Sequence, residues 1–124
     1  MTTRHAALLL AASLTLALPA PVLAHTHVIS SSPREGARLA RVPAVIAVTF
    51  GDPIGRLGTM TVTRNGAGDL VRSARIAPRD RSTALIFIKR PGPRKRAGTY
   101  RLVWRVTGAD GHRVAGTIAF RVRP

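Results

Sequence analysis

Cysteine is absent from all 124 residues of this chain. Its absence excludes a disulfide framework and any metal site built on thiolate ligands. Methionine and aromatic residues are scarce too, with two Met, one Trp, one Tyr and three Phe. Stability must therefore come from a hydrophobic core and from whatever ligand the folded chain binds.

Long apolar runs are missing except at the N-terminus, where the pattern predicts a secretory signal peptide over residues 1–24. A short polar segment precedes an apolar run from Ala6 to Leu18, and Val22-Leu23-Ala24 then ends in a small residue. The run is too short for a comfortable membrane span, and no later segment is long enough to be one. We expect cleavage after Ala24, a periplasmic or extracellular product, and one mature domain over residues 25–124.

Acidic residues are few, and the chain is strongly basic. Five Asp and Glu stand against 20 Lys and Arg, a formal charge of +15 that falls to +14 when Arg4 leaves with the signal peptide. Five of the eight residues from Lys89 to Arg96 are cationic, and the prolines and glycine among them exclude a regular element. Such runs are usually solvated. The alternative is contact with an anionic surface through Lys89–Arg96, and no specific nucleic acid is expected.

Alternating apolar residues predict an all-β fold, a single Greek-key sandwich or barrel of the immunoglobulin-like type with about seven short strands. No helix is expected after the signal peptide. One face of each of the last two strands should be buried in the core: Tyr100, Leu102, Trp104 and Val106 on the first, and Val114, Ile118, Phe120 and Val122 on the second. The expected strands are a short one after His25, then Val45–Phe50, Gly58–Arg64, Leu70–Ile76, Ala84–Ile88, Tyr100–Val106 and Val114–Val122.

Three finer expectations concern the middle of the chain. Arg34–Leu39 should be a loop. Asn65–Asp69 supplies residues that tolerate positive φ, which predicts a hairpin from Gly58–Arg64 into Leu70–Ile76. The nearly unbroken apolar run Ala84–Ile88 is typical of a strand buried on both faces.

Histidine is the residue type that points to chemistry. Cleavage after Ala24 would leave His25 first, His27 third and His112 in a turn. A free α-amine has a pKa near 8, so a metal ion displaces its proton at modest cost, and the amine and ring of His25 can chelate one ion. His112 adds a ring nitrogen, and Asp110 can supply an oxygen or orient a ring. Nitrogen and oxygen donors in a tetragonal array suit Cu(II).

Two coordination modes remain open at this point. In the second, the amine, two deprotonated backbone amides and the His27 ring wrap a square-planar Cu(II) without help from the fold. Only the first mode needs Asp110 and His112. Asp110-Gly111 alone is a common turn dipeptide, and a lone loop histidine is usually just solvated. The coincidence with a histidine exposed by cleavage is what favours the first mode.

These residues together resemble the CopC copper-resistance proteins, and the likeness covers nearly all of residues 25–124. It rests on His25-x-His27, Ser31-Ser32-Pro33, Glu35-Gly36-Ala37, Val48-Thr49-Phe50 before Asp52-Pro53, Gly98-Thr99-Tyr100, Trp104-Arg105-Val106, Ala109-Asp110-Gly111-His112 and Gly116-Thr117-Ile118-Ala119-Phe120. The resemblance implies an exported Greek-key β-barrel that binds Cu(II) through His25, Asp110 and His112, with His27 as a further candidate. It also implies a role in copper tolerance or uptake beside a CopD-type inner-membrane transporter.

The predicted function is therefore copper binding without catalysis. One Cu(II) per chain would be buffered or delivered outside the cytoplasm. A separate Cu(I) site is not expected, because Met60 is the single methionine after residue 24 and Cu(I) selects soft thioether ligands. The alternatives are a histidine-brace copper oxygenase and a cationic module that binds lipid or nucleic acid.

The position of the cleavage site is testable directly. Mass spectrometry of the exported protein should give a product of residues 25–124 that begins at His25. A cut even one residue away removes or blocks the amine of the predicted chelate, and an observed mass of that kind would contradict the first coordination mode.

Overall fold

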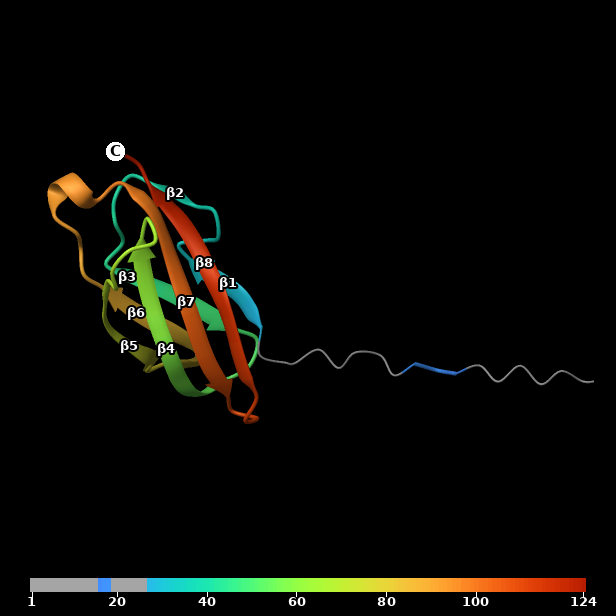
Figure 1. The fold of residues 1–124 in the computed structure, drawn as a ribbon. Helices are drawn as coiled ribbons and strands as arrows, with labels where there is room; N and C mark the ends of the chain where they lie inside the picture. The colour runs from blue at the N-terminus through green and yellow to red at the C-terminus, as the bar shows by residue number, and fades with distance from the viewer. Residues whose placement is uncertain (1–15, 19–26) are drawn as a thin grey trace, which may run out of the picture.

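The computed structural model describes residues 16–18 and 27–124, in which two four-stranded sheets pack face to face (Figure 1). The predicted signal cleavage and His25 lie outside the described residues. One sheet has the order β1-β3-β6-β5 and the other β2-β8-β7-β4. The strands are β1 (Val28–Ser32), β2 (Arg38–Leu39), β3 (Val45–Phe50), β4 (Ile54–Arg64), β5 (Val71–Ala77), β6 (Asp80–Ile88), β7 (Gly98–Gly108) and β8 (Arg113–Val122).

The chain changes sheet at every connection from β1 to β5 and again between β6 and β7, which confirms the predicted Greek-key sandwich. The described residues form eight strands rather than the expected seven or so. The additional strand is β2, in the segment predicted as a loop, and it pairs in parallel with β8 through Leu39 opposite Val122. Among residues 16–18 and 27–124, no helix has the length and apolar character needed to cross a bilayer.

The predicted hairpin after β4 is wrong, although its turn chemistry is confirmed. Asn65, Gly66 and Gly68 all have positive φ, at 50°, 78° and 74°. β4 and β5 nevertheless belong to different sheets, because β4 pairs with β7 while β5 pairs with β6. Asp69 supports the crossover by accepting two hydrogen bonds. One comes from the backbone N–H of Val62, at 3.2 Å, and the other from the backbone N–H of Val71, two residues further along the chain, at 3.0 Å.

Two further expectations need correction. In β6, Ala84, Ile86 and Ile88 are buried, but Leu85 and Phe87 are only partly covered, because they alternate with the core-facing residues and lie on the other face of the sheet. The basic loop also contains a regular element, the short 3₁₀ turn η1 (Pro93–Lys95).

The core lies between the sheets and contains the predicted inward faces of β7 and β8, except that Val114 is only partly buried. Two aromatic pairs occupy it. Phe50 meets Trp104 edge to face at 5.0 Å, and Tyr100 stacks on Phe120 at 5.3 Å between ring centroids. Such pairs contribute about 1 kcal/mol each beyond area burial.

Gly116 lies directly opposite Trp104 across β7 and β8, and a Cβ at this position would overlap the indole ring. We expect Gly116→Ala to lower the free energy of unfolding by about 2 kcal/mol, because the ring must move in a packed core. Denaturant unfolding followed by the fluorescence of Trp104, the single tryptophan, measures this.

Gly92→Ala is the matched control. Gly92 has an ordinary φ of −56° and nothing within 4 Å of an added Cβ, so stability should change by less than about 0.5 kcal/mol. Equal effects of the two substitutions would show that the contact between Gly116 and Trp104 is not what limits the packing.

Candidate metal centre

Asp110 and His112 lie in the tight turn that joins β7 to β8. The turn is closed by backbone hydrogen bonds: Gly108 N–H donates to the His112 carbonyl at 2.8 Å, and Gly111 N–H donates to the Gly108 carbonyl at 2.9 Å. Gly111 has a φ of +88°, a left-handed conformation that favours glycine at this position. The turn therefore presents the residues on either side of Gly111 with a fixed backbone.

The Asp110 carboxylate binds His112 twice. Its Oδ1 accepts the backbone N–H of His112 at 3.0 Å, and its Oδ2 lies 2.9 Å from the ring Nδ1. An ionised carboxylate only accepts hydrogen bonds, so Nδ1 carries the hydrogen and the lone pair of the neutral ring is on Nε2. The His112 side chain is 70% exposed and that of Asp110 38%, which leaves this nitrogen accessible.

The electrostatics of the pair keep Asp110 ionised. The backbone N–H of His112, then its ring, hold the pKa of the Asp110 carboxyl below its ordinary value of 3.8. At neutral pH the carboxylate is therefore a permanent acceptor for the imidazole. A carboxylate that fixes one ring nitrogen while the other is open is a common support for a metal-binding histidine.

The three-residue connector between β3 and β4, residues 51–53, is hydrogen-bonded both to the start of β1 and to the β7–β8 turn. Gly51 N–H donates to the His27 carbonyl at 2.8 Å, and two residues later the Pro53 carbonyl accepts the N–H of Ala109 at 2.9 Å. The first strand thus begins at the same end of the barrel as the β7–β8 turn (Figure 1). The sequence has no signal for this link, because a backbone hydrogen bond between distant segments leaves no side-chain signature.

The structure brings together two of the four predicted site residues, Asp110 and His112. His27 is exposed on the other side of the connector, and His25 lies outside the described residues. Within residues 16–18 and 27–124, no group of three His, Cys, Asp or Glu side chains is arranged to hold a metal ion. The β7–β8 turn by itself offers one oriented ring nitrogen and one carboxylate.

Comparison with known proteins gives the family. The family model of the CopC domain matches residues 28–123. The chain belongs to the CopC domain family. A relative, the copper transport protein CutJ of Bacillus subtilis (strain 168), is 29% identical to this CopC-domain chain over 107 residues, 85% of the chain but 19% of CutJ. The chain thus spans about a fifth of the length of that protein.

Solved structures agree on the fold. CopC from Methylosinus trichosporium OB3b is 20% identical with a TM-score of 0.69, covering 81% of this chain and 95% of that one. PcoC, a methionine-rich copper resistance protein from Escherichia coli, is 28% identical with a TM-score of 0.61, covering 81% of this chain and all of PcoC. The family resemblance and the Greek-key β-barrel expected from the sequence are therefore confirmed.

The hydrogen bonds of the turn predict a selective change in acidity. His112→Ala removes the ring but keeps the backbone N–H, so the pKa of Asp110 should rise yet stay below 3.8. Carboxyl carbon NMR titration measures this, and Asp80 is an internal control, because Thr83 and Ser82 lower its pKa independently. An unchanged midpoint for Asp110 would show that its ring contact is absent in solution.

Proposed function

We propose that this CopC-domain chain is an exported Cu(II)-binding protein of copper resistance or homeostasis, which buffers the ion or delivers it. The observation that carries the proposal is the Asp110–His112 pair, whose open Nε2 faces solvent at the end of the barrel where β1 begins. Family membership and the likeness to a copper transport protein and to a copper resistance protein support copper as the cargo.

The proposed site contains one Cu(II), bound by the amine and ring of His25 and by Nε2 of His112. Two residues of backbone span at most about 7 Å, so the new terminus would lie close to His27. The carbonyl of His27 is hydrogen-bonded to the same connector that holds Ala109, next to Asp110. These bonds support a close approach of the terminus to the turn.

Asp110 has two possible roles, as an oxygen ligand or as the partner that orients the His112 ring. Both of its oxygens already accept hydrogen bonds from His112, which favours the orienting role. His27 remains the further candidate ligand, either beside this site or in a wrap formed by the N-terminus alone. Met60 is half-buried opposite Trp104 and offers a single thioether, so no Cu(I) site is proposed.

Binding rather than catalysis is favoured by the location of the aromatic residues. A histidine-brace oxygenase acts on extended glycans, commonly across exposed aromatic rings. Here Phe50, Tyr100, Trp104 and Phe120 are buried, and the half-buried Phe87 lies under the Arg75 guanidinium at 5.3 Å. A copper-loaded sample that oxidised a glycan with reductant or peroxide would overturn the carrier proposal.

A membrane partner completes the proposal. This chain matches about a fifth of the length of the copper transport protein CutJ. We propose that a membrane protein of the CopD type, which the family resemblance implies, accepts the ion from this domain. Delivery by this chain then requires that the ion be released from the exposed end of the barrel.

The copper site is tested by titrating protein that begins at His25. Wild type should bind one Cu(II). The double variant Asp110→Ala with His112→Ala should bind at least about tenfold more weakly and show altered electron paramagnetic resonance parameters, because a ring ligand and its support are lost. Asp110→Asn should have a smaller effect, since its amide oxygen still accepts a hydrogen bond.

His27→Ala is the control for the alternative mode and should leave the spectrum close to wild type. If the double variant binds like wild type while His27→Ala loses the signal, copper is bound by the N-terminal wrap and the proposed site is wrong. Protein with one extra residue before His25 should bind weakly under either mode.

A further inference from the structure

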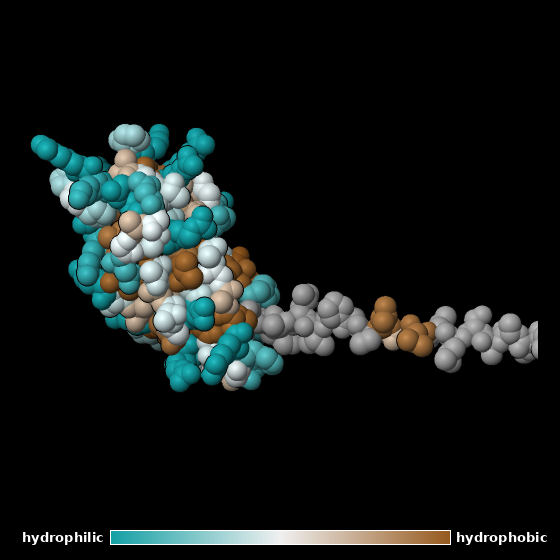
Figure 2. Space-filling model, in the orientation of Figure 1, coloured by the Kyte–Doolittle hydropathy of each residue, from teal (hydrophilic) through white to brown (hydrophobic). Residues whose placement is uncertain are grey.

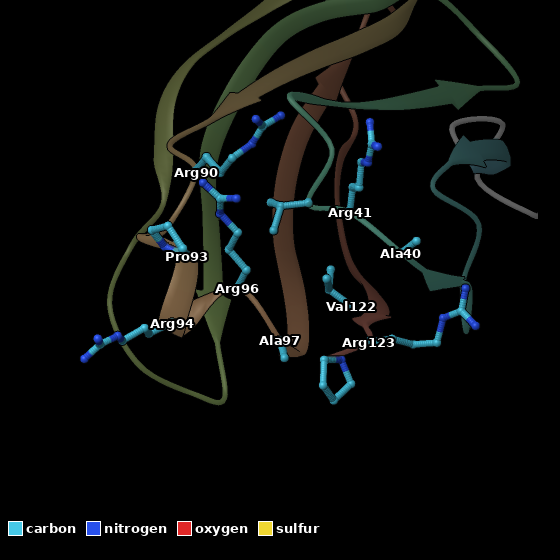
Figure 3. Close-up of a pocket in the computed structure, with 11 residues that line it drawn as sticks. Ala40, Arg41, Arg90, Pro93, Arg94, Arg96, Ala97, Val122 and Arg123 are labelled. Atoms are coloured by element: carbon cyan, nitrogen blue, oxygen red, sulfur yellow. The ribbon is translucent and has the colours of Figure 1, made fainter.

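A concave feature lined by arginines lies at the other end of the barrel from Asp110 and His112. It is a cavity of about 570 Å³ between the basic loop, the segment after β2 and the end of β8 (Figure 3). Five arginines contribute to its lining, from three separate segments. The lining residues are Ala40, Arg41, Val42, Arg90, Pro93, Arg94, Arg96, Ala97, Val122, Arg123 and Pro124.

The lining combines these arginines with apolar side chains. Val42 and Val122 both line the cavity and are buried, at 2% and 4% exposure. Arg90 and Arg96 lie on one wall and Arg41 on the wall across from them, while Arg94 and Arg123 extend outward at the rim (Figure 3).

Arg96 is held in place by the fold. Its Nε donates to the Pro91 carbonyl at 3.1 Å, and its own carbonyl accepts the hydroxyl of the buried Tyr100 at 2.6 Å. One guanidinium of the cavity is thus fixed before any ligand arrives, which reduces the entropy lost on binding.

No acidic side chain compensates these charges. None of the lining side chains is a carboxylate, and no Lys or Arg in residues 27–124 has a carboxylate oxygen within 4.0 Å. Pro124 also lines the cavity and carries the α-carboxylate of the chain, one negative charge against five arginines. A second cavity, of about 450 Å³, shares Ala97, Val122, Arg123 and Pro124 with the first and adds Arg38 and Arg121. Hydrophilic side chains cover most of this end of the molecule in Figure 2. Guanidinium groups gathered with so few counter-charges create a strong local field for anions.

We propose that this arginine cavity binds a phosphate-bearing anion with two or more negative charges. The planar fork of a guanidinium matches two oxygens of a phosphate, and several forks around one concave site favour a multiply charged ligand. No aromatic side chain lines the cavity, so a nucleobase would find nothing to stack on. Soluble anions and lipid headgroups both carry such a phosphate, and the test separates these two sources.

The cavity is independent of the proposed copper site. Ala97 precedes β7 and Ala109 follows it, and a strand of 11 residues spans about 35 Å. Failure of copper binding would leave this proposal intact, and the reverse also holds.

The test compares two double variants that remove the same charge. Arg41→Gln with Arg90→Gln changes two lining residues whose side chains have no hydrogen bond in the structure, and Arg96 is left alone because it supports the loop. Lys89→Gln with Lys95→Gln changes two exposed cations of the same loop that do not line the cavity. Circular dichroism and thermal unfolding confirm that both variants fold.

Calorimetric titration with pyrophosphate at low salt is the first measurement. Wild type should bind one pyrophosphate per chain. The arginine variant should bind at least about tenfold more weakly, and the lysine variant within about twofold of wild type. Equal losses in both variants would show that net charge alone attracts the anion. The proposal would be overturned if wild type bound neither pyrophosphate nor vesicles that contain phosphatidylglycerol.

Co-sedimentation with vesicles is the second measurement, using equal parts phosphatidylglycerol and phosphatidylcholine against phosphatidylcholine alone. Binding of anionic vesicles that the arginine variant loses, without pyrophosphate binding, assigns the site to lipid headgroups. Pyrophosphate binding without vesicle binding assigns it to a soluble anion. Vesicle binding retained by the arginine variant and lost by the lysine variant would contradict the cavity as the site.

Discussion

The apolar layer between the two sheets is the constraint on which the rest of this chain depends. Because the chain has no cysteine, no disulfide links the two sheets, and apolar packing in this layer holds them together. Strand β7 is central to the layer. Tyr100 and Trp104 anchor that strand against Phe120 and Phe50. Because β7 is fixed along its whole length, the loop before Gly98 and the turn after Gly108 are both held at defined ends of the barrel.

Local patterns predicted the strands well and their partners poorly. Val45–Phe50 was predicted with its observed bounds, because alternation reports which side chains are buried. Asn65–Asp69 correctly indicated a turn, but turn chemistry does not determine which sheet the next strand joins. Strand β2 was missed for a related reason: two residues carry no periodicity, and only the edge of β8 makes them a strand.

The functional residues divide in the same way. Asp110 and His112 are two positions apart, so sequence alone placed them in one turn, and the structure adds the hydrogen bonds between them. The link through Pro53 to the start of β1 depends on the tertiary fold and had no sequence signal. Likewise the basic loop was evident as a run of charge, whereas the contribution of Arg41 to a shared cavity was not.

The length of β7 weakens the electrostatic interaction between the two ends of the barrel. Its 11 residues span about 35 Å, roughly four times the screening distance of about 8 Å at physiological ionic strength. A cation at the β7–β8 turn is therefore shielded from the arginines at the opposite end. The arginines of the far cavity therefore add little to the repulsion of a positive ion at this tip, and that repulsion comes instead from nearer cations such as Arg113, next to His112, and Arg56, opposite Thr107.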